Sequence, residues 1–202
     1  MLKQSIRYLF VFILFLTSCA PLPYVFKART YVPGQNKGLL VCSVKTDKST
    51  LGSINPSYYI RKKGTDERLR IHLDGLSVPK EEVENGKYCN IVIFELPAGN
   101  YELFHWNLFY NYGLIQYERQ PKEEFSIAFS VKPDSINYIG ELTIDHYVMR
   151  IANRKDRDIK IAIEEEPSIS SLPVVKYDMP CEAGCSRKIE TTNEFFYLPI
   201  VH

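Results

Sequence analysis

Histidine, the side chain most often used for acid–base catalysis and metal binding, is scarce in this sequence. The 202 residues include only four histidines, and no two are spaced so that one helix or strand would bring them to a single metal ion. The Gly-x-Ser-x-Gly turn of serine hydrolases, a glycine-rich phosphate loop and the His-Glu-x-x-His zinc motif are absent as well. We therefore expect no catalytic residues, no metal site and no cofactor, and a protein that is not an enzyme.

Excess charge of one sign is also missing. The chain has 25 Lys and Arg against 24 Asp and Glu, so its formal net charge is +1. This balance gives no long-range attraction to a polyanion, and we expect no nucleic acid partner. Charge gathers locally in the acidic run 164–166 and in a basic ribbon, both of which we expect to be solvated faces. The basic ribbon consists of Arg61, Lys62, Lys63, Arg68 and Arg70.

The N-terminal apolar run is too short to span a bilayer, which takes about 20 residues. It covers Tyr8 to Leu16, follows the basic residues Lys3 and Arg7, and has the length of a secretory signal. It ends in Leu16-Thr17-Ser18-Cys19, which places a small residue and then a cysteine directly after the run. A plain secretory signal and an ordinary N-terminal membrane helix are the alternatives.

Leu16-Thr17-Ser18-Cys19 resembles the lipobox of bacterial lipoproteins. That resemblance implies that residues 1–18 are a signal peptide and that Cys19 is acylated, on its sulfur by fatty chains such as palmitate and on its new amino group. Several acyl chains hold a protein stably on a membrane, whereas a single chain is marginal. In Gram-negative bacteria an aspartate after the cysteine favours the inner membrane. Ala20 occupies that position here, which implies the periplasmic face of the outer membrane.

Four cysteines remain once Cys19 carries lipid, in a chain expected to leave the reducing cytoplasm. Two disulfides can be arranged in three ways. We favour Cys42 with Cys89, because both lie in strand-like runs, and Cys181 with Cys185 across a small loop. A zinc site is the alternative, but the spacing of the last two cysteines is weak for zinc and is not the C-x-x-C of thiol oxidoreductases.

Alternating apolar residues and a high content of aromatics, with 14 Tyr and 11 Phe, favour β-structure. The pattern predicts strands over 39–44, 57–62, 67–73, 88–96, 101–112, 125–131, 137–144, 147–152 and 195–198. The run 101–112 is long for one strand, so we expect a bulge or kink in it. Pro79 to Gly86 predicts one helical turn. Residues 156–166 fit either a strand, because isoleucines alternate there, or a short helix capped by Asp156, and we favour the helix.

Two motifs carry a resemblance to known folds. The segment from Leu96 to Leu103 is similar to the Leu-Pro-x-Gly-x-Tyr-x-Leu turn of transthyretin-like, carboxypeptidase-regulatory-like β-sandwiches. Phe129 to Leu142 resembles an element of bacterial lipoproteins of unknown function, with Asp134 in place of the usual glycine. These resemblances imply an all-β, Ig-like or transthyretin-like sandwich, a fold that usually serves as a binding or spacer module.

The expected organisation is a signal peptide (1–18), a lipidated cysteine with its linker (19–37), a β-sandwich domain (38–166) and a C-terminal extension packed on the sandwich (167–202). The expected function is that of a non-catalytic envelope lipoprotein, held on the membrane by lipid, that binds another envelope protein or has a structural role. The alternative is a module that binds carbohydrate or peptidoglycan. Its ligand would stack on rim aromatics at Tyr110, Tyr112 and Tyr117.

Overall fold

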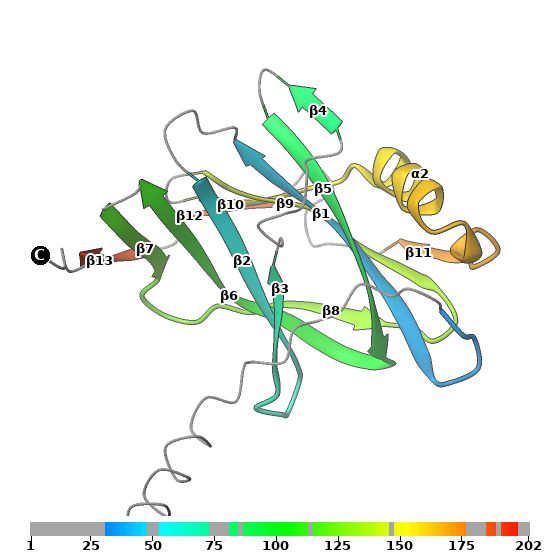
Figure 1. Ribbon diagram of the computed structural model, residues 1–202. Helices are drawn as coiled ribbons and strands as arrows, with labels where there is room; N and C mark the ends of the chain where they lie inside the picture. Colours follow the sequence, from blue (N-terminus) through cyan, green and yellow to red (C-terminus); the bar gives the residue numbers. More distant parts are fainter. Residues whose placement is uncertain are drawn as a thin grey trace, which may run out of the picture.

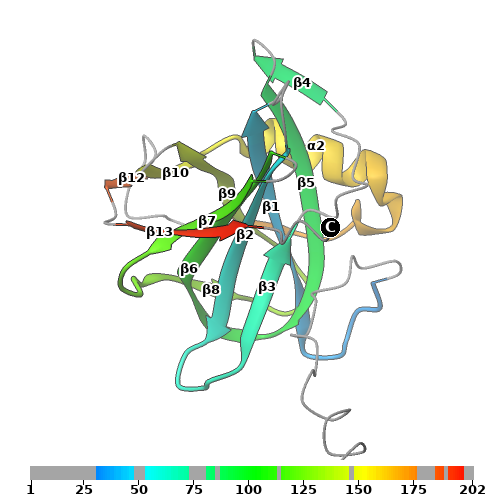
Figure 2. The ribbon, with the colours of Figure 1, turned by 60° about the vertical axis from the view of Figure 1, so that its left-hand side comes forward.

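Two β-sheets packed face to face, with one helix on the outside of the first sheet, make up the protein (Figure 1, Figure 2). The computed structural model describes residues 31–47, 53–72, 81–84, 87–112, 115–145, 148–176, 185–188 and 191–197. The prediction of an all-β sandwich with a short helical addition is confirmed. No helix within these residues is long and apolar enough to cross a membrane.

The first sheet carries the helix. Its strands run in the order β12-β10-β9-β1-β5-β4, and β11 pairs with β9. Their bounds are β1 Lys37–Asp47, β4 Glu81–Glu84, β5 Lys87–Pro97, β9 Ile136–Asp145, β10 Val148–Ala152, β11 Val174–Lys176 and β12 Cys185–Lys188. Helix α2, Lys155–Glu165, and the 3-10 turn η1, Pro167–Ile169, follow β10.

The second sheet runs in the order β13-β7-β6-β2-β3, and β8 pairs with the first half of β6. Its strands are β2 Ser53–Lys62, β3 Arg68–His72, β6 Gly99–Tyr112, β7 Ile115–Pro121, β8 Ile127–Val131 and β13 Thr191–Tyr197. The predicted hairpin between residues 57 and 73 is the β2–β3 pair.

The apolar core has two parts because strand residues alternate between the faces of a sheet. In β1, Leu40 and Val44 point between the sheets, into a cluster that includes Trp106. Leu39 and Val41 point the other way, toward α2, into a second cluster with Ile159, Ala162 and Ile169. At β1 the first sheet is therefore buried on both faces, which explains why residues 39–44 are apolar apart from Ser43.

Helix α2 confirms the choice of a helix over a strand for residues 156–166. Ile159 and Ala162 are three positions apart, so helical geometry places them on one face, where both are buried against the first sheet. The helix begins at Lys155, and its N-cap is Arg154 without a side-chain capping bond. Asp156 is therefore not the cap but lies in the first turn. A carboxylate in that position interacts favourably with the positive end of the helix dipole.

The helical turn predicted for 79–86 is wrong. Residues Glu81–Glu84 form β4, a short edge strand that pairs with β5 through Glu81 opposite Cys89 and Glu82 opposite Tyr88. The backbone hydrogen bonds of β5 outweigh the local helix signals, because a short helix gains little without a face to bury.

The predicted bulge in β6 is confirmed. Tyr59 of β2 lies opposite His105, but the next residue, Ile60, lies opposite Leu103, so Phe104 is the extra residue. The bulge turns Phe104 away from the space between the sheets. Its ring is covered by the guanidinium of Arg61, 4.3 Å from the ring centroid.

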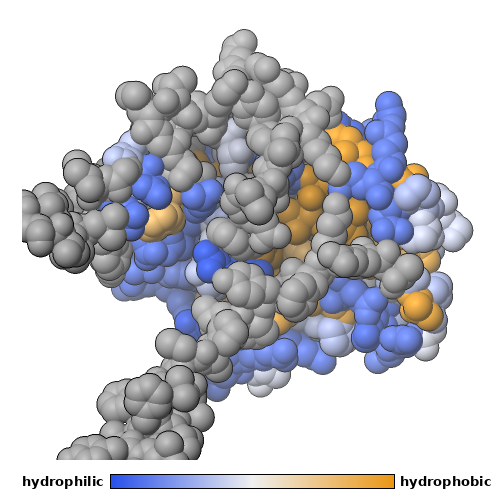
Figure 3. Space-filling model, viewed as in Figure 1, coloured by the Kyte–Doolittle hydropathy of each residue, from blue (hydrophilic) through white to orange (hydrophobic). Residues whose placement is uncertain are grey.

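Two arginines of the predicted basic ribbon are neutralised by carboxylates. Arg61 pairs with Glu102 at 2.6 Å and with Glu124 at 2.8 Å, and Arg68 pairs with Glu124 at 3.1 Å. Charge on this side is therefore mixed, and hydrophilic residues form much of the lower border of the face in Figure 3, with apolar surface near its middle.

Residues 31–36, which precede the predicted domain start at residue 38, contact the sandwich. Tyr31 is 9% exposed and donates a hydrogen bond to Asp134 at 3.0 Å, and the Gly34 amide donates to the same carboxylate at 2.7 Å. Asp134 has a φ of 49°, which explains the glycine of related motifs at this turn. Gly38 lies so close to the turn that a Cβ would be 2.1 Å from the Lys132 carbonyl oxygen.

Candidate functional site

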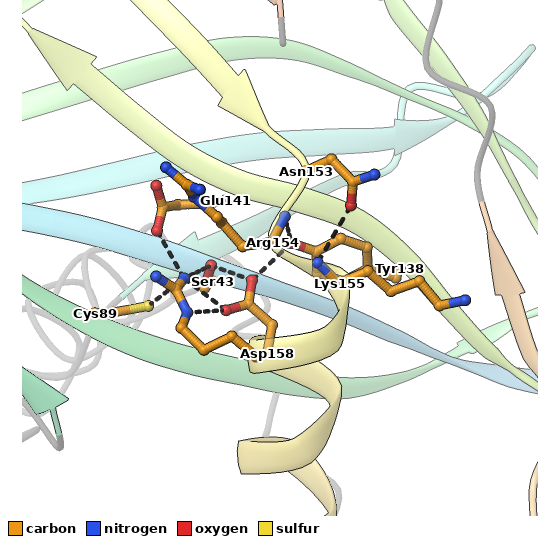
Figure 4. A network of polar contacts seen from close by, with 9 residues as sticks. Ser43, Cys89, Tyr138, Glu141, Asn153, Arg154, Lys155 and Asp158 are labelled. Carbon is orange, nitrogen blue, oxygen red and sulfur yellow. Dashed lines mark hydrogen bonds and ion pairs between the residues drawn. The ribbon is translucent and has the colours of Figure 1, made fainter. Parts of the chain in front are cut away.

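A buried polar cluster lies beneath α2, on the outer face of the first sheet (Figure 4). At its centre is Asp158, whose side chain is fully buried. One carboxylate oxygen, Oδ2, accepts hydrogen bonds from Ser43 Oγ of β1 and from Tyr138 Oη of β9, each at 2.6 Å. Tyr138 Oη in turn accepts a bond from the Arg154 amide at 3.1 Å, at the start of the helix. The cluster thus joins the first turn of α2 to two strands.

Arg157 completes this cluster from its solvent side. Its Nε and Nη2 donate to Asp158 Oδ1 at 2.8 and 2.6 Å. The same Nη2 lies 2.7 Å from Glu141 Oε2 and 3.3 Å from Cys89 Sγ. The Arg157 side chain is 25% exposed, whereas the side chains of Glu141 and Asp158 are 4% and 0% exposed. One partly exposed guanidinium therefore pairs with two buried carboxylates.

The pKa shifts of the cluster keep its thiol and phenol protonated. Burial raises the pKa of Cys89 from its ordinary 9.0 to about 11, although Ser43 and Arg157 oppose the rise. Burial and the hydrogen bond to Asp158 raise the pKa of Tyr138. Burial disfavours the charged form of Arg157, but its bonds to Glu141 and Asp158 prevail and raise its pKa.

This arrangement is suited to holding the helix rather than to chemistry. A nucleophilic serine needs a neighbouring base that accepts its proton, usually an imidazole, but Ser43 donates directly to a carboxylate that three further hydrogen bonds hold. The Cys89 thiol is 2% exposed and stays protonated near neutral pH. Within the described ranges, no group of three or more His, Cys, Asp or Glu side chains is arranged to hold a metal ion.

The predicted disulfide between Cys42 and Cys89 is wrong, because both thiols are free in the structure. The two cysteines lie on neighbouring strands, but Cys42 is opposite Val92 and points into the core between the sheets. Cys89, three positions before Val92, points to the other face and contacts Arg157. Of the second predicted pair, Cys181 and the side chain of Cys185 lie outside the described residues.

A second candidate site is formed by the three tyrosines that the sequence analysis placed at a rim. Tyr110 of β6 lies opposite Tyr117 of β7, and their rings stack with centroids 4.2 Å apart and planes 9° apart. Tyr112, two positions along β6, has its centroid 6.3 Å from that of Tyr110 and 6.2 Å from that of Tyr117. We call these three residues the tyrosine cluster.

The tyrosine cluster runs from the core to the surface. Tyr110 is 8% exposed and belongs to the core between the sheets, Tyr117 is half-buried against that core, and Tyr112 is 40% exposed. Burial raises the pKa of Tyr117, as do the neighbouring tyrosines and a hydrogen bond with Tyr112. The Arg119 guanidinium lies 5.7 Å from the centroid of the Tyr110 ring. Only the outermost ring, that of Tyr112, has substantial surface open to solvent.

The structure therefore brings together the three predicted rim tyrosines, whereas the predicted lipidation site, Cys19, lies outside the described residues. The polar cluster beneath α2 was not predicted. Its members come from elements far apart in sequence, such as Ser43 and Asp158, which are 115 positions apart. The available signal was Asp158 beside Ile159 on the apolar face of a predicted helix, since a carboxylate there requires a buried partner.

In comparisons with known proteins, no family model, curated protein or solved structure matches this chain. The resemblances to lipoproteins and to transthyretin-like sandwiches therefore rest on the sequence motifs themselves.

Proposed function

We propose that this chain is a non-catalytic lipoprotein of the bacterial cell envelope that acts as a protein-binding or structural module. The observation that carries the proposal is Leu16-Thr17-Ser18-Cys19 at the end of a short apolar run, in a chain whose later residues form a β-sandwich. Acyl chains on Cys19 would hold the domain on the membrane. The fold would then present its surfaces to partners in the envelope.

The way the chain enters the domain supports a tethered arrangement. Tyr31 is the first residue that the structure describes, and it is already packed on the sandwich. The proline-containing segment 20–30 separates it in sequence from Cys19, and a partly extended chain of this length would span roughly 30 Å at about 3 Å per residue. The contacts of Tyr31 and Gly34 with Asp134 fix the end of that segment on the domain, so a pull on the tether acts on a packed part of the fold.

A role in binding rather than catalysis is supported by the state of the polar cluster beneath α2. Its thiol and phenol are protonated, its two carboxylates are paired with Arg157, and its hydroxyl is bound to Asp158. These contacts explain the cluster fully as the attachment of a helix to a sheet.

We place the anchor on the periplasmic face of the outer membrane because Ala20 follows Cys19. An Ala20→Asp variant should shift the protein toward the inner membrane when membranes are separated by density. If the wild type already sediments with inner membranes, the proposed location is wrong.

Labelling of growing cells with an alkyne analogue of palmitate tests the anchor itself. We expect the wild-type chain to become labelled and a Cys19→Ala variant to lose the label. Cys42→Ala is the matched control, because it removes a cysteine that is buried in the core, and it should stay labelled. Equal labelling of the wild type and Cys19→Ala would rule the proposal out.

A further inference from the structure

The tyrosine cluster lies at the opposite end of the domain from residues 31–36, through which the described chain begins. Strand β6 begins beside that segment, where the Ala98 amide donates to the Asn36 carbonyl oxygen at 2.9 Å, and it ends at Tyr112. With 14 residues at about 3.3 Å each, minus the bulge, β6 separates these points by roughly 40 Å. In Figure 1, β6 crosses the molecule from the β8 side to the end that carries β7 and β13.

The chemistry of the tyrosine cluster favours a ligand that is apolar on its faces and polar at its edges. The ring of Tyr112 offers open apolar surface, and the buried Tyr110 and half-buried Tyr117 hold it in place by stacking. A tyrosine combines such a ring with a hydroxyl that both donates and accepts hydrogen bonds. Rings already ordered by their neighbours lose little side-chain entropy on binding.

Sugar rings meet these requirements more closely than the other envelope components do. A pyranose presents C–H groups on its faces and hydroxyls around its edge, which match an aromatic face bordered by phenol groups. A lipid headgroup of the anchoring membrane is a poor match. The tyrosine cluster lies at the other end of β6 from residues 31–36, through which the chain enters the described domain, and attraction to charged headgroups decays within about 10 Å.

We propose that the tyrosine cluster is a glycan-binding site, with Tyr112 as the stacking residue and its ring held by Tyr110 and Tyr117. The ligand class is a polysaccharide that presents uncharged pyranose faces, such as the N-acetylglucosamine units in the glycan strands of the cell wall. This inference rests on the proposed function, because it gives the structural module a polymer to hold at its far end. The protein would then connect the membrane to that polymer.

Binding of chitotetraose, a soluble tetramer of N-acetylglucosamine, to the full chain in detergent tests this proposal by calorimetry. The wild type should bind, and Tyr112→Ala should bind at least about tenfold more weakly, because one stacking contact is lost. Tyr112→Phe keeps the ring and should retain most of the affinity. Val32→Ala is the matched control, since Val32 is 55% exposed but lies on the tether side, and it should bind like the wild type.

Absence of chitotetraose binding to the wild type, together with no retention of the protein on isolated cell-wall sacculi, overturns the proposal. So does equal affinity of the wild type and Tyr112→Ala. Crosslinking from position 112 in cells that captures protein but no glycan overturns it in favour of a protein partner. Failure of the anchor appears separately, as loss of palmitate labelling with glycan binding intact, so the two proposals can fail independently.

Discussion

Tyr31 donates a hydrogen bond to the carboxylate of Asp134 across 3.0 Å, and this contact joins the first described residue to the turn between β8 and β9. The same carboxylate accepts the Gly34 amide at 2.7 Å. Burial and Asp134 together raise the pKa of Tyr31 to about 12, so the phenol remains a donor at every physiological pH. Asp134, the turn residue that departs from the lipoprotein motif, is thus the residue that holds Tyr31 and Gly34 on the sandwich.

Replacing Asp134 by glycine tests that role. Glycine suits the φ of 49° better than aspartate does, but it removes the acceptor of two hydrogen bonds. Bonds to a charged group contribute about 1.5 to 3 kcal/mol each, so the losses outweigh the relief and we expect a net loss of stability of about 1 to 3 kcal/mol. Urea unfolding of the two proteins measures this loss of stability. A variant as stable as the wild type would show that the tether is not secured by this residue.

Arg157 should be the most sensitive position of the polar cluster beneath α2. Its removal leaves two buried carboxylates without a counter-charge, and breaking such a pair costs about 3 to 5 kcal/mol. We expect Arg157→Ala to lower the free energy of unfolding by that amount. Lys160→Ala is the matched control on the same helix, because its 3.9 Å pair with Glu164 is exposed, and it should change stability by less than about 0.5 kcal/mol. Equal effects of the two variants would contradict the assignment.

The raised pKa of Cys89 predicts a loss of stability at alkaline pH. The folded state holds the thiol proton more tightly than the unfolded chain does, so this stabilisation is full below pH 9 and is lost as pH rises from 9.0 to about 11. Unfolding measured across this range should show a steeper fall for the wild type than for Cys89→Ala. If the stabilities of the two proteins fall in parallel, Cys89 does not contribute to the pH dependence of stability. Peptide mapping without reductant should also recover Cys42 and Cys89 as free thiols.

Two buried polar atoms lack a hydrogen-bond partner in the part of the chain that the structure describes, and removing one of them should not destabilise the protein. The two atoms are Tyr58 Oη and Trp106 Nε1. An unsatisfied hydroxyl costs roughly 1 to 3 kcal/mol, so Tyr58→Phe should leave stability unchanged or raise it by about 1 kcal/mol. Tyr138→Phe loses a bond to Asp158 and should destabilise the protein instead. Destabilisation by Tyr58→Phe would indicate a bound water or another partner.

The strands could be predicted from sequence because alternation is a local property. Ile127, Phe129 and Val131 alternate in β8, and the run around Val41 is apolar on both faces because the first sheet is covered twice. Strand β4 was missed because its partner, β5, decides its structure. Strand β7 was missed because polar residues occupy most of it.

Contacts between strands could not be predicted in the same way, because register is not visible in a single sequence. The prediction of a Cys42–Cys89 disulfide was wrong for this reason. A shift of one position in the register of two paired strands moves every side chain of one strand to the opposite face of the sheet. The tyrosine cluster was found because Tyr110 and Tyr112 share one face of a strand by alternation alone. Its stacking on Tyr117 depends on the β6–β7 register, which the structure supplies.

Mass spectrometry of the mature N-terminal peptide tests the central claim, lipid anchoring at Cys19, most directly. We predict a peptide that begins at Cys19 and carries the mass of several acyl chains, with residues 1–18 removed. A chain that keeps Met1, or one that begins at an unmodified Cys19, would contradict the account.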